Sequence, residues 1–166
     1  HVIRTQCHIN CMNYFAELLG YHFPEHDNDK IHDPVRIGYA YMNYARYHHR
    51  CKMLPVYIDA FNYAHAEHHR TQPHHIEHYD SVSDIPDIRL IEMVCDWFSA
   101  NFEQTHILHE KNVGNVYKFY KKFCKSSKWT RHQCKIIKTT IKQIETLADY
   151  NFVLKIWQPV LELSDL

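Results

Sequence analysis

Residues 83–103, SDIPDIRLIEMVCDWFSANFE, decide the fold class of this chain. Ser83 or Asp84 with Pro86 is a typical helix start, because a side-chain oxygen caps free amides and proline suits the first turn. Apolar residues then recur every three or four positions, the period of one helix face: Ile88, Ile91, Cys95, Phe98 and Phe102. The stretch therefore predicts a core helix that ends at about Glu103.

The rest of the chain shows the same helical period and few signals for strands or tight turns. Three glycines and six prolines leave little room for hairpins. We expect further helices at about residues 5–19, 33–50, 55–69, 113–124 and 128–155. These predict an all-α protein, one domain over residues 1–166 built as a compact bundle of about six helices. A metal-site core would lie at about 8–104, and basic C-terminal helices at about 112–156.

The net charge and the length of the apolar runs limit the kinds of molecule that this chain is expected to bind. Lysine plus arginine and aspartate plus glutamate are equal at 19 each, so the chain as a whole has no charge that attracts nucleic acid. Basic residues gather at 111–142, either as solvated helix faces or as a rim that attracts a phosphate-bearing substrate. Nucleic acid could bind only through this patch. No apolar run approaches the roughly 20 residues that span a bilayer, so we expect no membrane contact and a cytoplasmic protein.

The six cysteines show no CxxC spacing, and a chain of this size does not need disulfides to fold. We expect reduced, mostly buried thiols. Histidine is far more abundant than usual, at 16 residues, which indicates metal binding or acid–base chemistry.

Residues 65–80, HAEHHRTQPHHIEHYD, carry the strongest local signal for a metal site, with six histidines in sixteen positions. His68 and His69 lie at a predicted helix end, and Pro73 breaks the chain before His74 and His75. Two histidine pairs presented from opposite sides of a turn can hold one or two metal ions. The alternative is a solvated polar loop. The outer members of the stretch, His65 and His78, are expected to be bystanders.

Three further positions are candidate ligands. His8 lies on the apolar stripe of the first predicted helix, where a histidine is more often a hydrogen-bonded core residue than a ligand. His26 and Asp27 form an adjacent pair in the following loop, where both can converge on one ion. Asp96 lies among apolar neighbours, and a buried carboxylate is costly unless a cation compensates it. On the same helix, Glu103 is expected to face solvent.

The order of these residues resembles the HD-domain superfamily of metal-dependent phosphohydrolases, whose helical fold gathers an H…HD…H…H…D set around one or two metals. The segments EHDNDK, HHRTQPHHIEHYD and LIEMVCDWFSAN resemble more closely a family of unknown function from phages, large viruses and bacteria, with HDxSK, HH…NxHH and EMxCDW motifs. The resemblance covers about residues 8–104. The family's serine before the lysine is Asp29 here. If the chain is viral, the host cytoplasm is its expected location.

The resemblance implies an HD-domain-like bundle and two ligand sets. The first metal would be held by His8, His26, Asp27 and Asp96. Asp27 would bridge to a second metal, held by one histidine of each later pair: His68 or His69, and His74 or His75. The ions would be divalent, from among Fe, Mn, Zn, Ni, Co and Mg.

The activity that the resemblance implies is hydrolysis of a phosphate ester by metal-activated water, with a nucleotide or nucleotide-like molecule as the preferred substrate. Lys30 and Arg70 could clamp the phosphate, and His69 or His75 could move protons. Two alternatives stay open. One is an HD-type di-iron oxygenase, since histidine-rich sites suit iron. The other is a non-catalytic protein, such as a viral interaction module, in which metal ties helices together.

Overall fold

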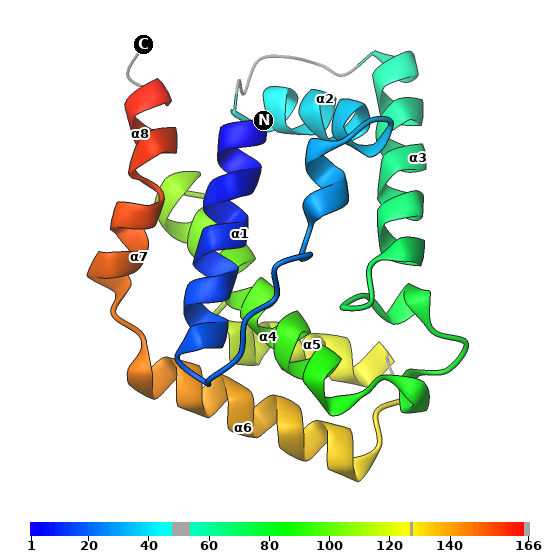
Figure 1. The fold of residues 1–166 in the computed structure, drawn as a ribbon, viewed down its shortest axis with the longest axis vertical. Coiled ribbons are helices and arrows are strands. Elements are labelled where there is room, and N and C mark those ends of the chain that lie inside the picture. The colour runs from blue at the N-terminus through cyan, green and yellow to red at the C-terminus, as the bar shows by residue number, and fades with distance from the viewer. Residues whose placement is uncertain (48–53, 127, 165–166) are drawn as a thin grey trace.

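The computed structural model describes residues 1–47, 54–126 and 128–164, and no strand occurs in these ranges. The all-α prediction is therefore confirmed. The helices pack into a single compact arrangement (Figure 1): α1 Val2–Glu17, α2 Val35–Tyr47, α3 Pro55–Thr71, α4 Asp87–Phe102, α5 Val116–Ser126, α6 Arg131–Leu147, α7 Tyr150–Ile156 and α8 Gln158–Ser164. Across the described ranges, none of these helices has the length and apolar character needed to cross a bilayer.

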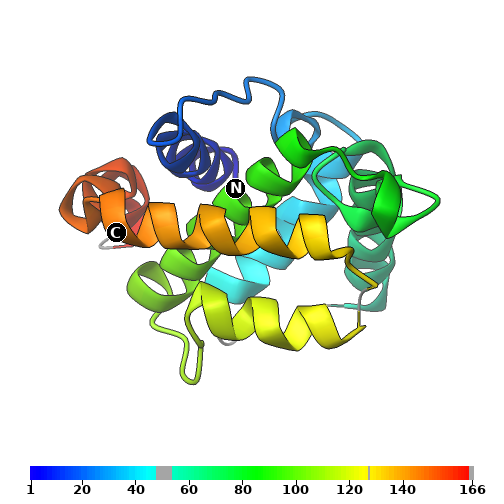
Figure 2. The same ribbon diagram turned by 90° about the horizontal axis from the view of Figure 1, so that it is seen from below.

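Helices α1 and α4 form the centre of the molecule, and α6 crosses beneath them (Figure 2). The buried side chains of α4 cover more of its surface than one stripe, because α4 packs against both α1 and α6: Leu90, Met93, Val94, Cys95, Phe98 and Phe102. Ile88, expected on the core face, is 37% exposed. The helix also begins at Asp87, because the chain first makes a separate 3-10 turn at Val82–Asp84, capped by the Ser81 side chain.

Helices α2 and α3 pack against each other and form an arm beside this centre (Figure 1). A β-carbon on Gly38 would lie too close to the backbone oxygen of Ala60 and the side chain of Ala64, so glycine lets the two helices approach. The arm has its own small buried cluster around Tyr39, separate from the main core. The predicted end of α2 at about residue 50 lies outside the described residues.

The C-terminal third departs most from the prediction. The single helix expected at 128–155 is wrong, because Ala148 is extended and a new helix begins at Tyr150. The Asp149 side chain accepts hydrogen bonds from the first amides of α7, and its own amide donates to the Tyr14 hydroxyl on α1. This break turns α7 and α8 along α1, where the Trp157 side chain is fully buried.

The cysteines that the structure describes are all free thiols, as predicted. Three of them, Cys7, Cys11 and Cys95, are buried in the main core, and Cys124 and Cys134 are half-buried. Burial raises the pKa of the Cys11 thiol to about 12, so the group stays protonated. Cys51 lies outside the described residues.

Candidate metal centre

The candidate site is built around Asp27, which is completely buried. Asp27 has a left-handed backbone, with φ of 56°, and directly precedes the 3-10 turn Asn28–Ile31. A non-glycine residue rarely adopts this conformation, and such strain is typical of functional sites. Lys30 at the other side of the turn donates from Nζ to Asp27 Oδ2 at 2.7 Å. The turn therefore places a buried carboxylate and its lysine partner together.

His8 from α1, His26 and Asp96 from α4 surround one side of the Asp27 carboxylate. His8 Nε2 lies 2.8 Å from Asp96 Oδ1 and 3.3 Å from Asp27 Oδ2. His26 Nε2 lies 3.6 Å from Asp96 Oδ1 and 3.8 Å from Asp27 Oδ1. One donor atom from each of the four residues lies within 4.8 Å of the others. The structure thus brings together the whole first ligand set that the sequence analysis names.

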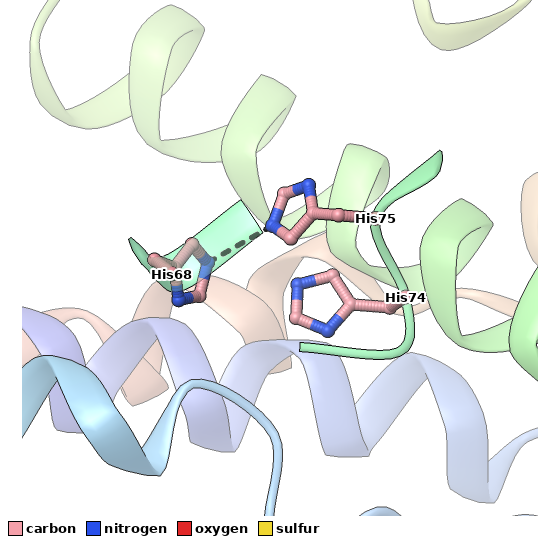
Figure 3. A group of neighbouring side chains, drawn as sticks. All are labelled: His68, His74 and His75. Carbon is pink, nitrogen blue, oxygen red and sulfur yellow. Dashed lines mark hydrogen bonds between the residues drawn. The ribbon is translucent and has the colours of Figure 1, made fainter. Parts of the chain in front are cut away.

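His68, His74 and His75 form a second group beside the same carboxylate, and the ring centroids of His74 and His26 are 4.2 Å apart. His68 comes from the end of α3 and the other two from the loop that follows, and their rings converge (Figure 3). His68 Nε2 lies 2.9 Å from His75 Nε2 and 3.3 Å from Asp27 Oδ1. His74 Nε2 lies 3.6 Å from Asp27 Oδ1. Asp27 therefore adjoins both donor groups. The sequence analysis left open whether His68 or His69 belongs to the second group, and this geometry selects His68.

Hydrogen bonds on the outer side of the rings orient three of these histidines. His26 Nδ1 lies 3.0 Å from Glu92 Oε1, and His68 Nδ1 lies 2.9 Å from Asp29 Oδ2. A carboxylate at these distances accepts a hydrogen bond from the ring N–H, so in the neutral ring the proton stays on Nδ1 and Nε2 carries the lone pair. Metal-binding histidines show this arrangement, because a partner on the far nitrogen fixes the tautomer and raises ligand basicity.

The third oriented ring is that of His8. Ser99 Oγ lies 3.0 Å from both the backbone oxygen of His8 and its Nδ1. The hydroxyl has one proton, and the carbonyl can only accept it, so Oγ accepts from Nδ1. The His8 Nε2 lone pair therefore also points towards the aspartates.

Sequence reasoning missed these orienting residues. Glu92 is only 1% exposed, and Glu103, expected at the surface, is also 1% exposed and pairs with Arg4. The prediction for Glu103 is wrong because the helix buries this side as well. Glu92 and Ser99 are spaced four and three residues from Asp96, so they share its helix face. That spacing was the available signal.

Several polar atoms at the centre of the site are buried without any hydrogen-bond partner in the structure. They are His26 Nε2, Asp27 Oδ1 and both ring nitrogens of His74. Each such atom costs about 1–3 kcal/mol when nothing compensates it. Imidazole nitrogens and carboxylate oxygens separated by 2.9–3.8 Å are spaced as ligands about 2.0–2.2 Å from one ion would be. The residues present therefore fit a divalent metal ion.

The charges of the cluster also favour metal binding. Burial lowers the pKa of His26, but Asp27, Asp96 and Glu92 outweigh it and raise that pKa to about 10, so without metal these surroundings hold a second proton on the ring. A metal ion would take the place of that proton at Nε2, in surroundings that favour a positive charge. Burial and the neighbouring His68 and His69 lower the pKa of His75 to about 2, so its ring stays neutral. A neutral imidazole is a ligand, whereas a group with so low a pKa is poorly suited to move protons near pH 7. This argues for His75 as a ligand and against the proton-transfer role expected for it.

A cleft of about 880 Å³ opens beside the cluster. Lys30, His69 and Asp96 line it, so these predicted residues meet at its wall. The expected phosphate clamp at Arg70 is not found there, because its guanidinium is 67% exposed and forms an ion pair with Glu67.

The two expected bystanders also lie outside the inner groups. The ring of His65 lies against that of His69 at a tilt of 35°, with centroids 3.9 Å apart. His78 is exposed and its Nδ1 bonds the backbone oxygen of Arg70.

Comparison with known proteins places the chain in a family without revealing an activity. No curated protein matches it, and no solved structure matches it. The model of one family, described as a family of unknown function (DUF5662), matches residues 1–147. The match includes every residue of the candidate metal centre and leaves out α7 and α8. The chain therefore belongs to DUF5662.

Proposed function

We propose that this protein is a metal-dependent phosphohydrolase of the HD-domain type, acting on a nucleotide or nucleotide-like phosphate ester. The observation that carries the proposal is the set of buried, unpartnered donor atoms around Asp27. His26 Nε2, Asp27 Oδ1 and His74 Nε2 lie close together in the buried cluster, and none of them forms a hydrogen bond. A cation is the partner that nitrogen and carboxylate donors share.

Two ions can be assigned to the two donor groups. His8, His26, Asp27 and Asp96 would hold one ion, and Asp27 would share a second with His68, His74 and His75. The abundance of imidazole favours Fe, Zn, Ni, Co or Mn over Mg, which prefers oxygen ligands. Such ions activate water and neutralise charge on phosphoryl oxygens.

The protein's own side chains supply binding and orientation. Lys30 holds Asp27 Oδ2 and also lines the cleft, so its ammonium can face the phosphate of a bound ester. His69 is partly exposed on the cleft wall, where it can exchange a proton with a leaving group.

The far wall of the cleft supports a nucleotide-like substrate. Trp97 meets Phe119 and Phe123 edge to face, with ring centroids 5.1 and 5.6 Å away, and all three line the cleft. Aromatic rings of this kind stack on nucleobases. The same wall carries three lysines of the predicted basic patch, Lys111, Lys118 and Lys122. Their charge would attract phosphate to a cleft whose inner end meets the metal ligands.

The proposal is tested by elemental analysis of protein purified without a histidine tag, followed by a phosphatase and phosphodiesterase panel. Asp27→Ala and His26→Ala are expected to lose both metal and turnover. His22→Ala is the matched control, because His22 is exposed and pairs only with Glu17 in this structure. Circular dichroism shows whether each variant is folded.

Full activity in Asp27→Ala or His26→Ala would end the hydrolase proposal. Iron content with oxygen consumption and no ester hydrolysis would instead favour the di-iron oxygenase. Bound metal with neither activity would favour a structural ion, although an ion beside an open cleft is unlike the closed shell of structural sites.

A further inference from the structure

A third group of donor atoms lies at the wall of the cleft. His69 Nδ1 is 3.2 Å from Glu77 Oε1, and the His69 and His75 rings stack with centroids 3.9 Å apart. One donor atom from each of these three residues lies within 4.8 Å of the others. The side chains of His69 and Glu77 are 20% and 53% exposed, whereas those of His68 and His74 are at most 1% exposed. This group is therefore accessible where the inner groups are buried.

A simple ion pair between His69 and Glu77 explains only part of this arrangement. An ion pair needs no third donor, yet the ring of His75 lies parallel to that of His69, at 16°. The three residues also come from different elements, α3 and the loop with the 3-10 turn Ile76–His78. Two imidazoles and one carboxylate form a donor set that binds divalent transition metals and leaves positions open.

We propose that His69, His75 and Glu77 form an outer site for a divalent transition metal at the wall of the cleft. The site shares His75 with the inner group of His68, His74 and His75. It does not depend on the proposed hydrolysis, and while a metal ion occupies it His69 acts as a ligand and not as the proton-transfer group. Three protein ligands leave coordination positions facing the cleft, where an anionic group of a bound molecule can attach. His75 Nε2 faces His68, and its second nitrogen lies on the other side of the ring (Figure 3). A neutral ring offers one lone pair, so His75 can bind an ion in each group at the same time only after it releases its remaining ring proton.

The test is a zinc titration of the complete, untagged and metal-stripped chain, followed by equilibrium dialysis and calorimetry. Wild type is expected to bind one more equivalent of zinc than Glu77→Gln, or to bind that equivalent more than about tenfold more tightly. Removing a residue that only orients a ligand already lowers metal affinity about 10–100-fold, so removing a ligand should have at least this effect. Glu67→Gln is the matched control: it also removes a carboxylate near the end of α3, but one that pairs with Arg70. It should bind zinc like wild type.

Two further variants separate this proposal from the hydrolase proposal. Asp27→Asn is expected to lose buried metal and keep the outer equivalent. His69→Asn should lose the outer equivalent while keeping the buried ones, which guards against misfolding of the Glu77 variant. Equal zinc binding by wild type, Glu77→Gln and His69→Asn would overturn the outer site. Loss of all zinc in folded Asp27→Asn would overturn it as well. Retention of all zinc in Asp27→Asn would count only against the buried centre.

Discussion

Replacing Glu92 by glutamine removes one negative charge behind the metal ligands and little else. Glu92 Oε1 lies 3.0 Å from His26 Nδ1, and its Oε2 lies 2.6 Å from Arg89. Glutamine can still accept the hydrogen bond from His26, and Arg89, at 36% exposed, can turn towards water. The helix should therefore stay intact while His26 becomes a weaker base, because the carboxylate helps to raise its pKa.

The size of the effect follows from the burial of Glu92, whose side chain is 2% exposed. A desolvated carboxylate behind a metal-binding histidine typically contributes 10–100-fold in metal affinity, which is about 1.4–2.7 kcal/mol. Excess metal stabilises the folded state by a free energy that depends on the affinity, so the variant loses the same amount, about 1.4–2.7 kcal/mol, of this stabilisation. For a chain of this size that corresponds to a loss of roughly 3–11 °C from the metal-induced rise in Tm.

Thermal melting with and without added Zn²⁺ measures this change. The metal-free Tm of Glu92→Gln should be lower than that of wild type, because the carboxylate also stabilises protonated His26. The rise in Tm on adding zinc, measured from that lower value, should be smaller. Glu67→Gln is the control, since Glu67 forms the same i,i+3 pair with an arginine, also at 2.6 Å, but away from the ligands. An undiminished rise in Glu92→Gln would refute the reasoning that Glu92 orients a metal ligand.

Three further outcomes are expected. Without metal, in the presence of a chelator, the free energy of unfolding by urea should fall below about pH 6.5. The pKa of His75 is about 2 in the folded protein, so in this pH range only the unfolded chain binds a proton at His75. The free energy of unfolding should then decrease by up to about 1.4 kcal/mol per pH unit. A stability that is flat between pH 6.5 and 5.5 would contradict this. Gly38→Ala should destabilise by about 1–3 kcal/mol despite the better helix propensity of alanine, because its β-carbon meets the backbone of α3; an unchanged urea midpoint would disprove the contact. Hydrogen exchange after chelation should speed up in α3 more than in α6, and equal changes would argue against a metal link to the arm.

The helical fold class and the positions of the candidate metal ligands were predictable because both follow from the spacing of residues that are close together in the sequence. His26 and Asp27 are adjacent, and the histidines of α3 and its loop fall within one short stretch. The apolar period of α4 placed Asp96 on a buried surface. Such spacing predicts which residues share a helix face, because the period of the α-helix is the same in every protein.

What the sequence could not supply depends on tertiary contacts. The break at Ala148 is stabilised by the hydroxyl of Tyr14, which lies far away in the chain. Asp29 becomes the partner of His68 only because the α2–α3 arm folds back over the turn that follows Asp27. Arg70 was a reasonable phosphate ligand by sequence, but Glu67, one helical turn before it, holds its guanidinium outside the cleft.

The same contacts explain why metal binding and folding should be coupled. The small apolar cluster of the arm is separate from the main core. Within the described residues the arm contacts the rest of the molecule through the turn Asn28–Ile31, through the loop after α3, and through hydrogen bonds from Asn43 to His1 and from Arg46 to Glu110. His68 on α3 and Asp96 on α4 approach the same buried carboxylate from these two bodies. Ions bound to the two donor groups would be joined through Asp27 and would replace unsatisfied donors with bonds across the junction. The free energy of metal binding would therefore also stabilise the junction. The cleft opens beside that junction. Bound metal would therefore fix the position of the α3 histidines, and any chemistry at the cleft wall would depend on whether metal is bound.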